Sequence, residues 1–287
     1  MTGSDRQPVS KPATQTGAGR PPLREIITRH GLAAKRSLGQ HFLLDGNLCA
    51  RIARAAGDLT THDVIEIGPG PGGLTRALLD AGARRIVAIE RDERCVAALG
   101  ELPETETERL RIIHGDALET DIVGLTTAPR LIVANLPYNV SVPLLLRWLG
   151  EVDAYSGMTL MFQKEVAARL TASPGSKEFG RLSVICQWLC DARTEFNVSK
   201  TAFTPPPKVT STVVSLTPHA EPLTARFDVL EKVTAAAFGQ RRKMVRTSLK
   251  GLGLDLAAAG IDETARAEEL SVEQFCALAR AVAEKSP

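Results

Sequence analysis

The chain of 287 residues lacks any apolar run long enough to cross a membrane. Its longest runs, Leu131 to Ala134 and Val142 to Leu146, fall far short of the ~20 residues that a membrane-spanning helix needs. The N-terminus also lacks the apolar segment of a signal peptide. Because 44% of the residues are hydrophobic, the chain can form a full core. We therefore expect a soluble, cytoplasmic protein without a membrane partner.

Cysteine and histidine are scarce and are not spaced as metal ligands. The five cysteines are an odd number in no zinc-like or disulfide-like spacing, so we expect free thiols. Cys186 and Cys190 lie four residues apart on a predicted helix, where packing is the simplest role. The five histidines form no ligand pattern, and no Ser-His-Asp or Cys-His arrangement can be argued. The sequence predicts no metal site and no nucleophilic catalysis.

The chain has little excess charge of either sign, since its formal net charge is only +2. Basic residues are nevertheless concentrated in "FGQRRKMVRTSLK", residues 238–250, which contains no acid. This segment provides Arg241, Arg242, Lys243, Arg246 and Lys250. Such a concentration suits a phosphate backbone, although the solvated face of a helix would look the same.

The order of apolar patterns predicts an α/β domain between two other segments. Residues 1–22 are rich in Pro, Gly, Ser and Thr and are expected to be a disordered tail. Residues 23–218 begin with two short helices and continue as short apolar strands alternating with amphipathic helices. That alternation favours a mainly parallel sheet covered on both faces. Residues 219–287 lack such strands and are expected to form a small helical domain.

Seven strands are expected in the α/β domain, and the last two are expected to close one edge of the sheet as antiparallel strands. Their ranges are 63–68, 84–90, 110–116, 130–135, 158–163, 192–198 and 210–218. The helices between them are expected at residues 72–82, 93–100, 142–150, 164–170 and 180–190.

A glycine turn, "EIGPGPGGLT", joins the first strand to its helix. Gly68, Gly70 and Gly73 satisfy the pattern G-x-G-x-x-G, and Glu90 ends the next strand where an acid can bind a ribose. A nicotinamide dinucleotide is therefore a candidate ligand. Glycines are also needed for tight geometry at such a turn, so the motif alone leaves the nature of the site open.

Polar residues end the neighbouring strands as well. Asp116, in "HGDAL", can accept a hydrogen bond from an adenine amino group while Ala117 covers the ring. It can equally be a turn residue or a helix cap. Gly68, Glu90, Asp116 and Asn135 end four successive strands, and ligands bind at this edge of open α/β sheets.

The fourth strand runs into "NLPY". Asn135 offers a side-chain carbonyl, Leu136 and Pro137 offer backbone carbonyls, and Tyr138 offers a flat face for a base. Together they can hold both hydrogens of an exocyclic amino group and leave the nitrogen lone pair free. Alone, the motif could also be a turn after a strand.

A proline-rich loop, "FTPPPKVTS", precedes the last strand. Three prolines usually only stiffen a loop. A stiff loop that begins with Phe203 also presents a stacking surface, and Lys208 beside it can contact phosphate.

These motifs in combination resemble the S-adenosylmethionine-dependent methyltransferases that act on the amino group of adenine. More narrowly, "SLGQHFLLD", "NLPYNVS", "MFQKEVAARL", "FGRLSV", "FTPPPKVTSTVVSL" and "FGQRRKMVRTSL" resemble the bacterial small-subunit ribosomal RNA adenine dimethyltransferases. The resemblance runs from about Ser37 to Leu278. Two departures are visible: His41 stands where the family often has Asn, and Phe179 stands where Tyr is common.

The resemblance implies a Rossmann-like class I methyltransferase sheet with a small all-α C-terminal domain, residues 219–287, that binds RNA. It implies that S-adenosylmethionine is the cofactor and that the target adenine is flipped out of its RNA context. The implied cofactor-binding residues are His41, Leu43, Gly68, Gly70, Glu90, Asp116, Ala117 and Asn135. The implied catalytic residues are Asn135, Leu136, Pro137 and Tyr138, with Phe203 closing over the other face of the base. The implied RNA contacts are Arg241, Arg242, Lys243, Arg246 and Lys208.

The activity implied is direct transfer of methyl groups to N6 of two adjacent adenines in the 3′-terminal hairpin loop of 16S ribosomal RNA. The substrate would be the immature small subunit, and the enzyme is expected to be a monomer. A macrolide-resistance type enzyme that methylates 23S ribosomal RNA remains an alternative. So does a ribosome-assembly binding factor in which catalysis is secondary.

Overall fold

The computed structural model describes residues 19–34 and 39–285. Residues 1–18 of the predicted tail lie outside the described residues. Its last four residues are described, and Arg20 among them is only 7% exposed. Arg20 Nη1 donates to Asp80 Oδ1 at 2.6 Å, and Arg20 Nε donates to Glu104 Oε1 at 2.7 Å. The chain therefore packs against the domain before residue 23.

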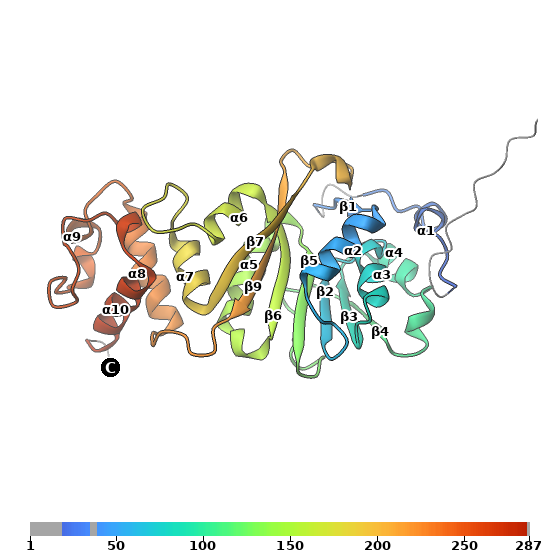
Figure 1. The fold of residues 1–287 in the computed structure, drawn as a ribbon, viewed down its shortest axis with the longest axis horizontal. Coiled ribbons are helices and arrows are strands. Elements are labelled where there is room, and N and C mark those ends of the chain that lie inside the picture. The colour runs from blue at the N-terminus through green and yellow to red at the C-terminus, as the bar shows by residue number, and fades with distance from the viewer. Residues whose placement is uncertain (1–18, 35–38, 286–287) are drawn as a thin grey trace, which may run out of the picture.

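A seven-stranded sheet of order β4-β3-β2-β5-β6-β9-β7 forms the centre of the molecule (Figure 1). The first five strands in this order, β4, β3, β2, β5 and β6, run parallel to one another. Strand β9 pairs antiparallel with β6, and β7 pairs antiparallel with β9. The bounds are β2 Asp63–Ile67, β3 Arg85–Glu90, β4 Leu110–His114, β5 Arg130–Asn135, β6 Gly157–Gln163, β7 Cys190–Val198 and β9 Ser211–Pro218. The predicted mainly parallel sheet with an antiparallel edge is confirmed.

Helices cover both faces of this sheet, as the wholly apolar strands predicted. Consecutive residues of β2 point to opposite faces: Val64 packs with Ile52 and Leu78 of α2 and α3, whereas Ile65 packs in the cluster that contains Trp148 of α5. The helices of this domain are α1 Leu23–Arg29, α2 Gly46–Ala55, α3 Gly73–Asp80, α4 Glu93–Leu99, α5 Tyr138–Gly150, α6 Lys164–Leu170 and α7 Arg181–Leu189.

The C-terminal part is helical and lies at one end of the elongated molecule (Figure 1). It contains α8 Phe227–Gly239, α9 Val245–Ser248 and α10 Val272–Ala283. The Phe238 ring stacks on Phe275 at 5.4 Å between centroids and meets Phe179 edge to face at 6.2 Å. Phe179 precedes α7, so the core of the helical part is continuous with that of the sheet domain. The boundary at residue 219 stays a prediction.

Three local features differ from the prediction. A small antiparallel sheet pairs β1 (Phe42–Leu43) with β8 (Phe203–Thr204), although neither two-residue strand shows a sequence pattern. Helix α5 begins at Tyr138 rather than at residue 142, so that Pro137 is its N-cap residue and Pro143 lies inside the helix. Cys190 lies in β7 with an extended backbone instead of ending α7.

The cysteines are placed in the interior of the protein. All five are buried, and none of them forms a disulfide within the described residues. Within the described ranges, no group of three His, Cys, Asp or Glu side chains is placed to hold a metal ion. None of the helices in that part of the chain is both long and apolar enough to span a membrane.

Candidate active site at the carboxyl edge of the sheet

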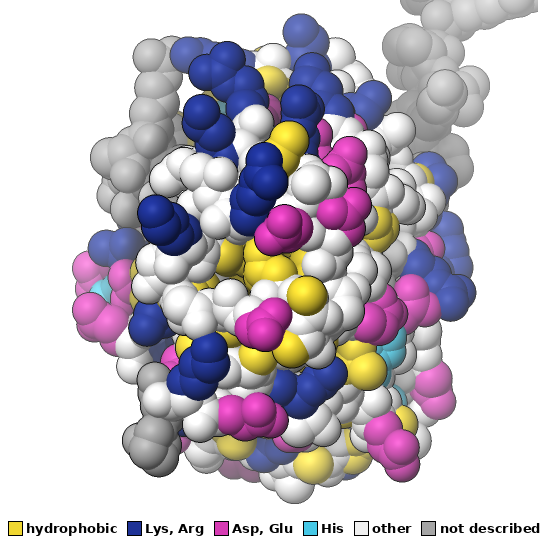
Figure 2. Space-filling view, turned by 90° about the vertical axis from the view of Figure 1, so that its left-hand side faces the viewer, with side chains coloured by type: hydrophobic (Ala, Val, Ile, Leu, Met, Phe, Trp, Pro, Cys, Tyr) yellow, Lys and Arg dark blue, Asp and Glu magenta, His cyan; other side chains and the backbone are white. Residues whose placement is uncertain are grey.

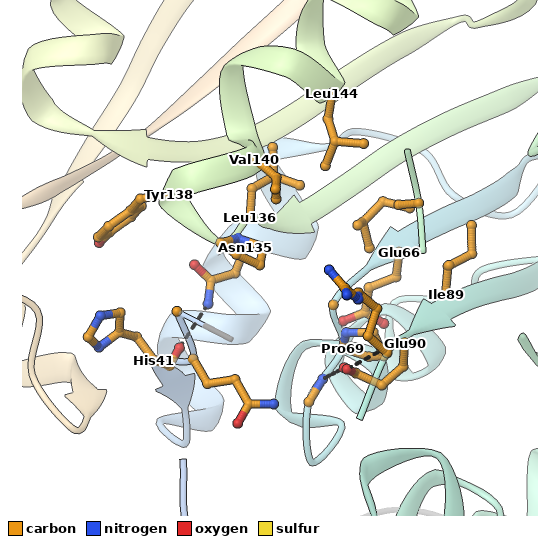
Figure 3. A pocket seen from close by; sticks show the side chains of 18 of the residues that line it. His41, Glu66, Pro69, Ile89, Glu90, Asn135, Leu136, Tyr138, Val140 and Leu144 are labelled. Atoms are coloured by element: carbon orange, nitrogen blue, oxygen red, sulfur yellow. Dashed lines mark hydrogen bonds between the residues drawn. The ribbon is translucent and has the colours of Figure 1, made fainter. Parts of the chain in front are cut away.

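A pocket opens at the carboxyl ends of β2, β3, β4 and β5, and it collects most of the predicted site residues (Figure 3). The predicted residues that line it are His41, Leu43, Gly68, Gly70, Glu90, Asp116, Ala117, Asn135, Leu136, Pro137 and Tyr138. Glu66 and Glu90 lie in one half of the pocket, and Asn135 and Tyr138 lie in the other (Figure 3).

The glycine turn lets the chain approach β1 closely. Gly70 has a φ of +56°, and a Cβ atom there would lie 2.9 Å from the Phe42 ring. At Gly73 a Cβ atom would lie 2.2 Å from the carbonyl oxygen of Leu43. Side chains are therefore excluded at both positions, and the turn stays open to a ligand on its other side.

Glu90 is held in place by the backbone around it. Its Oε2 accepts from Gly70 N at 2.9 Å, and its Oε1 accepts from Arg91 N and Asp92 N, both at 2.8 Å. Burial raises the pKa of this carboxyl, although the three N–H donors oppose the shift. With one donor on Oε2, that oxygen keeps an acceptor position for a ligand hydroxyl.

A second acid, Glu66, lines the same pocket and was missed by the sequence reasoning. Its side chain is 1% exposed, and its Oε2 has no hydrogen-bond partner among the described residues. Burial, and to a smaller extent the charge of Glu90, raises the pKa of Glu66 to about 8. The available signal was an acid inside the otherwise apolar interior of "DVIEIG". Two buried carboxylic acids in one pocket favour a cationic ligand.

Asp116 combines a structural role with a place at the pocket. Its Oδ1 accepts from Leu118 N at 2.9 Å, which closes a turn after β4. Its Oδ2 lies 3.2 Å from a guanidinium nitrogen of Arg91. The turn role considered for this residue is thus present, and the carboxylate also lines the pocket next to Ala117.

Asn135 faces the other half of the pocket. Its Nδ2 donates to the carbonyl oxygen of His41 at 3.1 Å. The amide oxygen is thereby turned to the side where Tyr138 and His41 lie (Figure 3). Pro137 caps α5, and its carbonyl oxygen accepts from Val140 N at 3.1 Å, which leaves this oxygen one further acceptor position.

The Tyr138 ring lines the pocket, and its hydroxyl is hydrogen-bonded to Ser211. The hydroxyl lies 2.6 Å from Ser211 Oγ, and burial raises the pKa of the phenol. The His41 ring lies 5.8 Å from the Tyr138 ring between centroids, tilted by 32°. His41 Nδ1 lies 2.8 Å from Pro205 O; a carbonyl only accepts, so Nδ1 is the donor. The His41 side chain thus lies beside the aromatic wall.

Phe203 is not among the residues that line the pocket. It is 3% exposed, pairs with Leu43 in the β1–β8 sheet and meets the His41 ring edge to face at 6.5 Å. Its predicted role over the second face of the base stays a prediction.

The basic segment lies at the helical end of the molecule and not at the pocket (Figure 1). Residues 240–244 form a turn between α8 and α9 rather than part of a helix. Arg241 is engaged there: Nε lies 2.8 Å from Glu268 Oε2, and Nη2 donates to Phe179 O at 3.0 Å and also to Lys177 O.

The other predicted RNA contacts are open to solvent. Arg242, Lys243 and Arg246 are exposed at the turn and on α9, and Lys208 is exposed on the loop before β9. Figure 2 shows Lys and Arg side chains gathered along the upper part of the helical end. These side chains are available for phosphate groups.

Comparisons with known proteins agree on one family. The family described as Ribosomal RNA adenine dimethylase matches residues 31–284. "Ribosomal RNA small subunit methyltransferase A" of Paramagnetospirillum magneticum is 64% identical over 266 residues, which cover 91% of this chain and 95% of that protein. A solved dimethyladenosine transferase from Plasmodium falciparum superposes with a TM-score of 0.73 at 25% identity, covering 85% of this chain and 98% of that one. The solved 23S rRNA methyltransferase ErmE gives a TM-score of 0.65 at 26% identity, covering 84% and 99%. The chain belongs to the ribosomal RNA adenine dimethylase family.

Proposed function

We propose that this protein transfers methyl groups from S-adenosylmethionine to N6 of two adjacent adenines in the 3′-terminal hairpin loop of 16S ribosomal RNA. The observation that carries the proposal is one pocket with two unlike halves, an acidic one at Glu66 and Glu90 and an amide–aromatic one at Asn135 and Tyr138. The family and the name of the 64% identical relative support the same activity.

The acidic half fits S-adenosylmethionine better than a nicotinamide dinucleotide. Glu66 and Glu90 are 1% and 6% exposed, and Glu66 Oε2 lacks a protein partner among the described residues. Ammonium and sulfonium groups would favour the ionised form of these two acids and pair with it, whereas the negative charge of a pyrophosphate would oppose their ionisation. The dinucleotide suggested by the glycine pattern is therefore disfavoured.

Each residue of the acidic half has a role in holding the cofactor. Glu90 accepts from a ribose hydroxyl, Asp116 accepts from the adenine amino group, and Ala117 covers that ring. Gly68 and Gly70 leave room beside the ligand, and Leu43 and the His41 backbone border it. The bound cofactor supplies an electrophilic methyl group on a sulfonium.

The other half holds the target adenine. The side-chain oxygen of Asn135 and the carbonyls of Leu136 and Pro137 accept the two hydrogens of the amino group, and Tyr138 stacks on the ring. Acceptors in these positions stabilise the positive charge that develops on N6 as it is methylated. Positioning of this kind can supply about 7–11 kcal/mol of the barrier, without a covalent intermediate. The methylated nitrogen then loses its proton to water.

The RNA lies across the exposed basic residues. Arg242, Lys243 and Arg246 contact phosphates at the helical end, and Lys208 contacts phosphate near the pocket. Because Arg242, Lys243 and Arg246 lie at the helical end of the molecule, far from the pocket, they suit a large, structured substrate (Figure 1). We propose that this substrate is 16S ribosomal RNA in the immature small subunit, bound in the cytoplasm by a monomer.

The alternatives have weaker support. The solved 23S rRNA methyltransferase is 26% identical, against 64% for the relative named for the small subunit. A binding factor without catalysis would not need Asn135, Tyr138, Glu90 and Asp116 around one pocket.

Labelled S-adenosylmethionine incubated with immature small subunits tests the proposal, with naked 16S ribosomal RNA and large subunits as parallel substrates. We expect label in adenine of the small subunit. Label confined to large-subunit RNA would establish the 23S alternative, and binding of small subunits without label would establish the assembly factor.

A further inference from the structure

Tyr138 is fixed at both ends. Its backbone is the first residue of α5, and its hydroxyl lies 2.6 Å from Ser211 Oγ, 73 residues further along the chain. Between these two points its ring borders the pocket (Figure 3). A ring held at both ends cannot swing away from the pocket without breaking the hydrogen bond to Ser211.

Ser211 is a rigid anchor for that hydroxyl. It is 0% exposed and opens β9, where it pairs with Gln163 of β6 on one side and Val198 of β7 on the other. A residue enclosed by two paired strands has little freedom to follow a moving partner. A serine hydroxyl both donates and accepts, so the bond to the phenol forms in either direction.

We propose that Ser211 is a positioning residue for methyl transfer, which fixes the plane of the Tyr138 ring against the target adenine. The inference rests on the proposed function, because it assigns the ring to base stacking. A base stacked on a fixed ring keeps its amino group at a fixed height relative to Asn135, and small errors in such alignment cost large factors in rate. Ser211 itself need not touch substrate or cofactor.

The neighbouring residue offers a matched control. Thr212 is also in β9, is 2% exposed, and its hydroxyl donates to Asn197 Oδ1 at 2.8 Å. Successive residues of a strand point to opposite faces, so its hydroxyl lies away from Tyr138. Thr212→Val therefore removes a buried hydroxyl from the same strand without changing the support of the ring.

The test compares Ser211→Ala, Tyr138→Phe, the double variant and Thr212→Val in methyl transfer to immature small subunits. Because Ser211→Ala loses the net contribution of one hydrogen bond, we expect its kcat to fall about five- to tenfold. Affinity for S-adenosylmethionine, measured by titration, should stay within about twofold because the cofactor half is unchanged. Thr212→Val should keep the wild-type kcat.

The double variant separates positioning from a loss of folding. Tyr138→Phe removes the same bond from the other side, so the double variant should be no slower than the slower single variant. Multiplicative losses, or equal losses in Ser211→Ala and Thr212→Val, would overturn the inference. A Ser211→Ala variant that methylates as fast as the active wild type would also overturn the inference. A wild type that methylates no adenine would instead overturn the proposed function, and the inference with it.

Discussion

The side-chain amide of Asn135 donates to the backbone carbonyl of His41 at 3.1 Å, which ties the end of β5 to the start of β1. This bond uses the nitrogen of the amide and leaves its oxygen for a substrate amino group. The group that we propose holds the base is thus oriented before any ligand binds, which is the condition for efficient electrostatic stabilisation of a developing charge.

Replacement of Asn135 by Ala should lower kcat by about 10²–10³-fold, the usual cost of one group that stabilises transition-state charge. Single-turnover methyl transfer to immature small subunits measures this effect. Asn47→Ala, on the exposed side of α2, is the matched control and should keep wild-type activity. An Asn135→Ala variant within threefold of wild type would remove the amide from the mechanism.

His41 should affect the RNA substrate more than the cofactor. Its ring contacts Tyr138 and is held by Pro205 O, whereas only its backbone meets Asn135. An aromatic contact predicts about a two- to tenfold rise in KM for RNA in His41→Ala. Titration with S-adenosylmethionine should show a smaller change. His62→Ala, just before β2 at the opposite sheet edge, controls for loss of an imidazole. A larger loss in cofactor affinity would place the ring in the cofactor site instead.

Glu66 should make the ligand-free protein less stable as the pH rises. Its folded-state pKa is raised from 4.5 to about 8, mainly by burial. Above pH 4.5 the unfolded chain loses this proton while the folded chain retains it, so stability falls between about pH 4.5 and pH 8. At 1.36 kcal/mol per pKa unit, the penalty at pH 8 is at most about 5 kcal/mol.

Glu66→Gln should remove this penalty. Thermal unfolding followed at pH 5 and pH 8 should show similar midpoints at pH 5 and a higher midpoint for the variant at pH 8. Equal pH slopes for the two proteins would mean that Glu66 is ionised in the folded state. Glu119→Gln, at an exposed acid, provides the charge-matched control.

Arg241 and Arg242, adjacent in the chain, should behave differently. Arg241 holds Glu268 and the carbonyl of Phe179, so Arg241→Ala should lower the unfolding midpoint by about 2–6 °C. Arg242 is exposed, so Arg242→Ala should keep the midpoint while reducing RNA affinity and lowering the slope of log K against log salt by about one. If Arg241→Ala kept the midpoint and weakened RNA binding instead, Arg241 would exchange its bonds to Glu268 and Phe179 O for contacts with RNA.

The fold followed from the sequence where local chemistry decides the structure. Asp45, whose side chain accepts from Asn47 N and Leu48 N, caps α2, the second of the two short helices expected before the first strand. The wholly apolar strands predicted a sheet covered on both faces, and Glu90 and Asn135 met at its edge because parallel strands share one carboxyl end.

The unpredicted features depend on contacts between distant segments. The pairing of Phe42 with Thr204 and the bond from Tyr138 to Ser211 join residues 162 and 73 positions apart. The partners of Arg241 lie in two other segments, so its sequence neighbourhood suggested a phosphate contact or a solvated helix face and not these bonds. Periodicity and capping do not report such contacts.

Mapping of modified nucleosides tests the central claim most directly. Small subunits lacking the modification are treated with the wild-type protein and S-adenosylmethionine, and the 16S ribosomal RNA is digested and analysed by mass spectrometry. We predict N6,N6-dimethyladenosine at two adjacent adenines of the 3′-terminal hairpin loop, and much less of it after the same time with Asn135→Ala. Methylation at another atom or another base, or unmodified small-subunit RNA, would contradict the proposed function.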